Sequence, residues 1–455
     1  MRIAVVGTGI SGNAAAWALA ARHQVTVYEK DLRAGGHSHT VEIDYGGRRI
    51  AVDTGFIVYN EHNYPELTAL FDHLGVETVA SDMSFSVSAD GGRFEWCGRG
   101  RTLGEILDGV FAQRSNLMSP SFVWMLREMA RFNRVSVDDL AAGRLAGLTL
   151  GEYLATRRFS GRLVHDYLVP MGAAIWSTPV DRMLEFPAEN FVAFFDNHRL
   201  LHHDRPVWRT VKGGSRMYVE KLTARFRDRL RLGAAVTSIE RTKHGVIVTD
   251  TLGGRNIYDQ IVIAAHSDQA LAMLADATDQ ERATLGAIKY AANAVYLHRD
   301  LRLMPRRKRA WASWNFLRAT HDPEKWPPVF GKRSCVNNER GDVGGDVAVT
   351  YWTNNLQGIA PDCPLFVSLN PPVEPAAELT FAKFCCDHPQ FDAAAFAAQK
   401  QLELIQGTRR TWFCGAWTGY GFHEDGLRSG LMVAEALGAA IPWRKPAPAL
   451  AEAAE

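Results

Sequence analysis

The sequence predicts an α/β protein in which a dinucleotide-binding sheet is interrupted by an inserted α+β domain. Three observations carry this prediction. A glycine-rich turn lies between a short apolar run and a helical pattern close to the N-terminus. Apolar runs typical of buried parallel strands return in the middle and near the end of the chain. With 455 residues the chain is also too long for one simple core, so we expect two domains.

The first element is a strand–turn–helix unit. An apolar run is followed by three glycines in a GxGxxG arrangement and then by an alanine-rich helical pattern. The first glycine permits the tight turn, the second lets backbone approach a pyrophosphate, and the third lets the helix pack closely on the strand. The acid that ends the second apolar run can bind a ribose diol. This Rossmann-like unit predicts cofactor contacts at Gly7, Gly9, Ile10, Ser11, Gly12, Glu29 and Lys30.

A second glycine pair follows directly, in the stretch 33–40. The stretch resembles the RxGGRxx[S/T] signature of the flavin-containing amine oxidase and phytoene desaturase superfamily, with a histidine in the place of the second arginine. The resemblance implies FAD rather than a nicotinamide, with contacts at Arg33, Gly35, Gly36 and His37. Because the cysteine motif for covalent attachment is missing, we expect FAD to bind non-covalently.

The next apolar stretch, 50–59, is typical of a strand that turns into a loop. In the superfamily an Asp-x-Gly at this place brings the chain past the flavin ring. The resemblance therefore implies that Gly55, Phe56 and Ile57 line the ring. The alternative is an ordinary core strand, because apolar runs are usually just buried.

The remaining pattern divides the chain into two discontinuous parts. The FAD-binding domain is predicted at 1–59, 206–284 and 405–440, the substrate-binding domain at 60–205 and 285–404, and a flexible tail at 441–455. The stretch 60–205 is mostly helical in pattern, and small residues around Trp176 suggest a pocket wall or a buried structural tryptophan. We expect Tyr351 and Trp352, on a later strand, to line the same pocket.

One helical stretch, Leu117–Arg134, is rich in Met, aromatic residues and arginine. It predicts either a core helix or a basic amphipathic helix on a membrane surface. A basic cluster at 299–309 beside tryptophans leaves a similar choice between a solvated loop and a contact with anionic lipid head groups.

The chain then returns to the first domain. After Gly213–Gly214 a helix is predicted to end near Leu230, followed by a three-stranded meander whose last strand is 260–265. In the superfamily the residue matching Val236 contacts the adenine through its backbone. Near the C-terminus, 411–430 resembles the closing FAD motif, with Ala416 replacing the usual acid. This resemblance implies flavin contacts at Gly415, Gly426 and Leu427.

Two departures from the superfamily concern the chemistry. Amine-oxidising members have a lysine that holds a water against flavin N5, and Asn293 takes that place here. Those members also have an aromatic cage, and His423 occupies one cage position. We predict His423 as the base, since a neutral imidazole accepts a proton near pH 7, with Asn293 and Tyr59 as further catalytic candidates. A structural histidine is the alternative for His423.

Four motifs, including 36–40 and 419–426, resemble a bacterial flavoprotein subgroup often found with cyclopropane-fatty-acid-synthase-like lipid methyltransferases. The resemblance implies an acyl-lipid substrate. Our hypothesis is an FAD-dependent oxidoreductase that dehydrogenates or desaturates an apolar substrate, a modified fatty acyl lipid, by hydride transfer to flavin N5. The alternatives are a flavin amine oxidase and an FAD-dependent isomerase or mutase without net redox.

Composition sets further limits. Apolar residues are 47%, charged residues 22% and the formal net charge is +1, which argues against nucleic acid as a partner. The six cysteines lack CxxC or zinc spacing, so we expect free thiols and no metal. No apolar run approaches about 18 residues, and the first strand leaves no room for a signal peptide. We therefore expect a cytoplasmic protein, with peripheral contact to the anionic inner face of the membrane as an open alternative.

Overall fold

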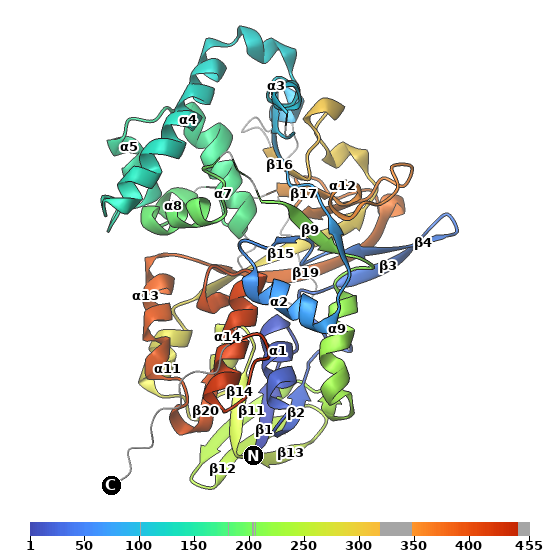
Figure 1. Cartoon of the computed structure of the whole chain (residues 1–455), viewed down its shortest axis with the longest axis vertical. Helices are drawn as coiled ribbons and strands as arrows, with labels where there is room; N and C mark the ends of the chain where they lie inside the picture. The colour runs from blue at the N-terminus through green and yellow to red at the C-terminus, as the bar shows by residue number, and fades with distance from the viewer. Residues whose placement is uncertain (101, 181, 203, 205, 319–347, 445–455) are drawn as a thin grey trace.

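The computed structural model describes residues 1–100, 102–180, 182–202, 204, 206–318 and 348–444. Elements from both ends and the middle of the chain gather in the lower part of Figure 1, and the helices between residues 103 and 197 gather in the upper part. The expected tail lies outside the described residues from 445 on. Residues 441–444, which we placed in that tail, pack instead: Trp443 stacks on Trp17, and Arg444 donates to Glu66 at 2.9 Å.

The lower part contains a five-stranded parallel sheet of order β10–β2–β1–β14–β20. Its strands are Leu230–Arg231, Gln24–Tyr28, Arg2–Val6, Gln260–Ile263 and Thr411–Phe413. Two helices, α1 (Ile10–Leu19) and α14 (His423–Ala436), pack side by side against it (Figure 1). The predicted strand–turn–helix unit is therefore present, and three distant segments complete its sheet.

The predicted meander is present with a different last strand. It is formed by β11 (Val236–Thr242), β12 (Gly245–Asp250) and β13 (Arg255–Tyr258). The apolar run that we assigned to its third strand is β14 of the parallel sheet. Asp259 separates the two, because its amide donates to the Arg2 carbonyl and its carboxylate accepts from the Arg2 amide. The helix after Gly213–Gly214 is α9 (Arg216–Thr223), continued by a 3₁₀ segment to Arg229.

The second domain is built on a seven-stranded sheet of order β19–β15–β18–β17–β16–β7–β8. Its strands are Thr380–Gln390, Lys289–His298, Phe366–Leu369, Ala348–Trp352, Trp314–Arg318, Phe85–Ala89 and Phe94–Gly98. The hairpin β7–β8 interrupts the stretch that we expected to be mostly helical. Covering helices are α3 (Leu103–Val110), α4 (Pro120–Ala141), α5 (Leu150–Thr156), α7 (Val169–Trp176) and α8 (Ala188–Asn197).

Smaller elements join the two parts. These are the hairpin β3 (Thr40–Tyr45) and β4 (Arg48–Asp53), the sheet β5 (Tyr59–Asn60), β9 (Trp208–Val211) and β6 (Thr78–Ala80), and the helices α2 (Pro65–Leu74), α10 (Ser267–Met273), α11 (Asp279–Leu285), α12 (Thr353–Gln357) and α13 (Ala393–Gln401). Helix α2 ends at Gly75, whose φ of +60° suits a glycine. Strand β4 ends at Asp53 and continues as a loop, as the sequence predicts.

The apolar face of helix α4 was predicted to belong either to the core or to a membrane-surface helix. Phe122, Met125 and Phe132 are fully buried, so this face is core. No helix of the described residues is long and apolar enough to cross a membrane. Cys97, Cys363 and Cys414 are buried free thiols, whereas Cys335 lies outside the described residues.

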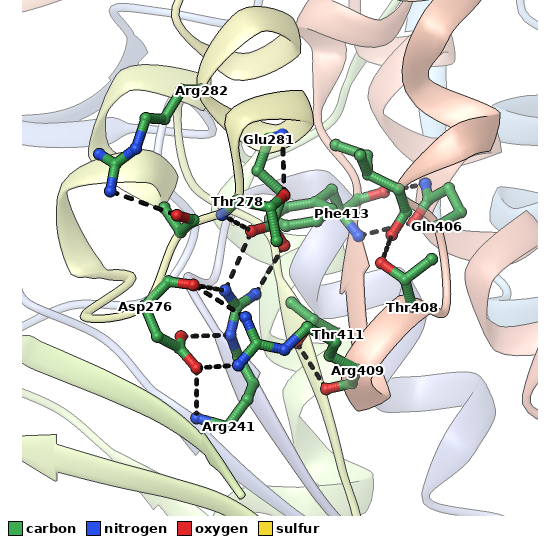
Figure 2. Close-up of polar contacts among 12 residues, drawn as sticks. Arg241, Asp276, Thr278, Glu281, Arg282, Gln406, Thr408, Arg409, Thr411 and Phe413 are labelled. Atoms are coloured by element: carbon green, nitrogen blue, oxygen red, sulfur yellow. Dashed lines mark hydrogen bonds and ion pairs between the residues drawn. The ribbon is translucent and has the colours of Figure 1, made fainter.

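A buried ion cluster fixes the meander to the rest of the lower domain (Figure 2). The Arg241 side chain on β11 is 1% exposed and donates to Glu281 on α11 at 2.6 and 2.9 Å. Asp276, before α11, accepts from Arg241 at 2.6 Å and also from Arg409 near β20. Burial alone would raise the pKa of Glu281, but hydrogen bonds from Arg241 and the Thr278 amide hold the pKa below its ordinary value.

We predict that Arg241→Met lowers the free energy of unfolding by about 3–5 kcal/mol, because Glu281 is then buried without a cation. Arg255→Ala on β13 removes an exposed ion pair with Glu240. This variant should change the free energy of unfolding by less than about 1 kcal/mol. Chemical denaturation of the two variants measures both values. The double variant Arg241→Met/Glu281→Met should recover part of the loss. If Arg241→Met is as stable as Arg255→Ala, the buried ion cluster does not stabilise the fold as we expect.

Candidate functional site

A cavity of about 1080 Å³ runs from the glycine-rich turn of the parallel sheet into the second domain. One end is lined by the turn after β1 and the end of β2, and the other by side chains from α4, α7 and the seven-stranded sheet. A cleft at the carboxyl ends of parallel strands is where α/β folds bind their ligands. The two ends differ in chemistry and are described in turn.

Backbone forms the floor of the first end. Gly7 has φ +98°, and a Cβ there would lie 2.6 Å from the Ala264 carbonyl oxygen, so the turn requires glycine. A Cβ on Gly9 would meet no atom within 4 Å, because this residue faces the cavity. Gly9 is also the N-cap of α1, and no side chain caps the helix. The first amides of α1 are therefore available to an anion, as a pyrophosphate requires.

Glu29 lies at the end of β2 and lines the same region. It is buried, and its Oε2 accepts from the Thr8 amide at 2.9 Å and from the Thr8 hydroxyl. Its Oε1 accepts from the Asp31 amide at 3.0 Å. These bonds fix the carboxylate beside the cavity, where it fits a ribose diol.

The second glycine pair folds over the first. A Cβ on Gly36 would lie 3.1 Å from the Gly9 Cα, and Arg33 donates to the Gly36 carbonyl at 2.9 Å. Burial, assisted by Arg33, lowers the pKa of His37. His37 is therefore neutral where the superfamily signature has a permanent cation. Backbone amides, the start of α1 and the cations Lys30 and Arg33, rather than this side chain, are left to balance the phosphate charge.

Most of the predicted cofactor contacts line the cavity. They are Gly7, Gly9, Ile10, Ser11, Glu29, Lys30, Arg33, Gly36, His37, Gly55, Phe56, Ile57, Val236 and Gly415. Four others do not line the cavity: Gly12, Gly35, Gly426 and Leu427. A Cβ on Gly426 would lie 2.9 Å from Ile10 Cγ2, and Leu427 is fully buried, so these two residues serve the packing of α14 on α1.

His423 lines the cavity at the start of α14. Its ring stacks on Phe56 at 3.9 Å between centroids, and its Nε2 lies 2.6 Å from the Tyr218 hydroxyl. Burial lowers the pKa of His423 to about 3, so the imidazole is neutral. A neutral ring beside the Phe56 loop has the state that a proton acceptor needs.

The other two catalytic candidates lie outside the cavity lining. Asn293 is buried between strands, where its side-chain amide donates to the Ala291 and Cys386 carbonyls and its oxygen accepts from Asn370 at 2.8 Å. All its polar atoms are used by the sheet. Tyr59 is also buried, and it packs edge-on against Phe71 at 5.3 Å.

The predicted pocket residues divide in the same way. Trp176 and Tyr351 line the cavity. Trp352 does not, because side chains alternate along β17, and its ring packs against Trp311 at 5.4 Å instead.

Four further histidines, His39, His198, His266 and His388, line the cavity and were not predicted as site residues from the sequence. His388 on β19 lies with Nδ1 2.9 Å from the Ser177 hydroxyl, and burial lowers its pKa to about 3. Ser177 has φ +52°, an uncommon conformation for a residue other than glycine. His266, just after β14, stacks on Tyr290 at 4.5 Å, and burial also lowers its pKa to about 3. His266 could have been predicted as a site residue, because it directly follows a buried parallel strand. The sequence contains no feature that predicts the pairing of Ser177 with His388.

The second end of the cavity is apolar and aromatic. Its lining includes Met83, Phe85, Trp96, Met129, Met171, Trp176, Trp208, Trp314 and Tyr351. Away from the dinucleotide end, the charged residues among the described lining residues are Arg199 and Asp387. No group of His, Cys, Asp or Glu in the described part of the chain could hold a metal ion. This end suits a substrate with a long apolar portion.

A family model described as flavin containing amine oxidoreductase matches residues 10–298. The chain belongs to this family. FAD is accordingly its cofactor, and the open cradle at Gly9, the uncapped start of α1 and the fixed carboxylate of Glu29 fit that group. No curated protein sequence matches the chain.

Solved structures share the fold of this flavoprotein over nearly its whole length. A redesigned putrescine oxidase has a TM-score of 0.65 and 16% identity, and the match covers 96% of this chain and 99% of that chain. Cyclohexylamine oxidase from Brevibacterium oxydans IH-35A has a TM-score of 0.62 and 17% identity, with 96% and 99% covered. The CLA-producing fatty acid isomerase from P. acnes has a TM-score of 0.60 and 16% identity, with 95% and 98% covered.

We predict that Gly9→Ala weakens FAD binding by at least tenfold, because its methyl group would project into the space left for the cofactor. Flavin absorbance per mole of purified protein and titration of the apoprotein with FAD measure the effect. Gly104→Ala in α3 is the matched control, since its Cβ also meets no atom within 4 Å but lies far along the chain. Equal FAD affinity in both variants would mean that the cofactor does not approach Gly9.

Proposed function

We propose that this flavoprotein dehydrogenates or desaturates a largely apolar substrate, a modified fatty acyl lipid. The observation that carries the proposal is the apolar and aromatic wall that continues from the flavin-binding end of the cavity into the second domain. An acyl chain gains free energy by leaving water for such a wall, without any charged group to anchor it. The resemblance to a subgroup associated with lipid methyltransferases agrees with this substrate class.

The neutral state of the histidines supports the same chemistry. Bound FAD supplies a two-electron acceptor for a hydride from a substrate C–H bond. The protein must also take up one proton from the adjacent carbon, so that a double bond forms between the two carbon atoms. We assign this role to His423, whose lowered pKa leaves its imidazole unprotonated at neutral pH. His388 is the second candidate, because its ring also lines the cavity and its lowered pKa leaves it neutral.

The aromatic side chains would exclude water from the reacting carbon atoms. Trp176 is held among Phe186, Phe191 and Phe194, with the nearest ring centroid at 4.6 Å. Such a packed cluster keeps its shape when an apolar chain enters, because buried aromatic rings are tightly packed. The substrate would therefore be positioned by shape rather than by hydrogen bonds.

Amine oxidation is the second candidate, because Asp387 lines the cavity and could pair with an ammonium group. The folds of putrescine oxidase and cyclohexylamine oxidase agree with it. Against it, Asn293 replaces the lysine of the amine oxidases and is turned into the sheet. A third candidate is an isomerase reaction without net redox, since a fatty acid isomerase has a similar fold.

We expect anaerobic mixing of the holoenzyme with methylated or cyclopropanated phospholipid to bleach the flavin absorbance and to yield a product two mass units lighter. Unmodified phospholipid is the control. Release of hydrogen peroxide from amines, with no bleaching by any lipid, would establish the second candidate instead. A product of unchanged mass would establish the isomerase.

His423→Gln should slow flavin reduction by about 100-fold while FAD stays bound, because glutamine cannot take up the proton. His244→Gln, on an exposed turn of the meander, is the control. In the unchanged enzyme the reduction rate should be constant from about pH 5 to 8, since a base with a pKa of about 3 is unprotonated throughout, and should fall only in stronger acid. If His388→Gln slows flavin reduction and His423→Gln does not, the base is His388 instead of His423.

A further inference from the structure

The segment from α3 to the first turns of α4 exposes an unusual number of apolar side chains. Of the seventeen large apolar residues that are exposed in the described part of the chain, six lie within 103–124. They are Leu103, Ile106, Leu107, Leu117, Met118 and Trp124. Met118 is 88% exposed and Trp124 54%. We call this set the apolar tip.

The apolar tip lies at one end of the molecule. In Figure 1 α3 and the adjoining end of α4 form the top of the view, opposite the N-terminus and the parallel sheet. The 3₁₀ turn Arg114–Met118 connects the two helices there. Exposed apolar side chains that are concentrated in one segment of a protein are typical of an interaction site.

Basic side chains surround the tip. Helix α4 continues beyond Trp124 with Arg127, Arg131 and Arg134, all on its exposed side. Lys308 and Arg309, from the basic cluster 299–309, are exposed in the segment that contacts α3. Helix α3 contains two acids: Asp108 is paired with Arg99 and Arg114, and Glu105 accepts from the Thr102 amide at the start of the helix.

We propose that the apolar tip inserts into the surface of a membrane that contains anionic lipid. Apolar side chains at the end of a structure, with arginine and lysine at their border, match the boundary between acyl chains and negatively charged head groups. A second copy of this chain fits less well, because a two-fold pairing through the tip would bring the same arginines together.

The position of α4 connects this surface with the cavity. Met129 on α4 lines the cavity, whereas Trp124 and Arg127 face outward on the same helix. An acyl chain that leaves the bilayer at the tip would therefore meet a helix that forms part of the cavity wall. This delivery step rests on the proposed function, but binding to the membrane does not, since it needs no turnover.

Co-sedimentation of the holoenzyme with vesicles tests the proposal. We expect binding to vesicles of phosphatidylglycerol and phosphatidylcholine, weaker binding to phosphatidylcholine alone, and a decrease at high salt. Met118→Glu/Trp124→Glu should reduce binding at least tenfold. Leu252→Glu/Leu404→Glu is the matched control, because these residues are 71% and 59% exposed and lie outside the tip.

A second pair of variants separates charge from apolar contact. Arg127→Glu should weaken binding to the anionic vesicles, whereas Arg49→Glu, in an exposed pair with Glu42, should not. Equal sedimentation of the tip variant and its control would overturn the proposal. A dimer in solution that Met118→Glu/Trp124→Glu dissociates would also overturn it, in favour of a second copy at this surface. Failure to oxidise lipid with vesicle binding intact would reject only the proposed function.

Discussion

The site depends on the close approach of backbone at the GxGxxG turn. A Cβ on Gly12 would overlap the carbonyl oxygen of Gly7, and a Cβ on Gly430 would overlap that of Ser11. These contacts let α1 start directly after β1 and let α14 lie against α1. The uncapped amides of α1 and the first turn of α14 therefore reach the same cavity, although their segments are about 400 residues apart. Side chains larger than hydrogen at either position would separate the phosphate end from His423.

This constraint explains why the flavin end could be predicted from the sequence. Tight turns, positive φ angles and close backbone contacts require glycine locally, so the spacing of Gly7, Gly12 and Gly36 reveals them in the sequence. The same logic located the parallel strands, because their burial on both faces demands continuous apolar runs. The error at 260–263 arose because β13 ends at Tyr258 and β14 begins at Gln260, so that Asp259 alone divides two strands that belong to different sheets.

The substrate end could be predicted only in part, because it is made by pairing between distant segments. Asn293 was predicted from its position along a strand, but the direction of its side chain is set by Asn370, just after β18, and by Cys386 on β19. His388 and Ser177 are separated by 211 positions and meet only through the packing of α7 on β19. The hairpin β7–β8 was missed for a related reason: β7 pairs in parallel with β16, more than 200 residues later.

The electrostatics of the cavity follow from the same packing. Rings of Phe56 and Tyr290 stack on His423 and His266, and burial holds the pKa values of these imidazoles at about 3. A cavity with neutral bases removes the cost of bringing an apolar chain next to a charge, yet keeps lone pairs available for protons. Among the described lining residues away from the dinucleotide end, Asp387 is the carboxylate that an ammonium group could pair with. The proposed apolar substrate rests on this balance, because a hydrocarbon portion gains free energy by leaving water, whereas an ammonium group would have to exchange its hydration for these few acceptors.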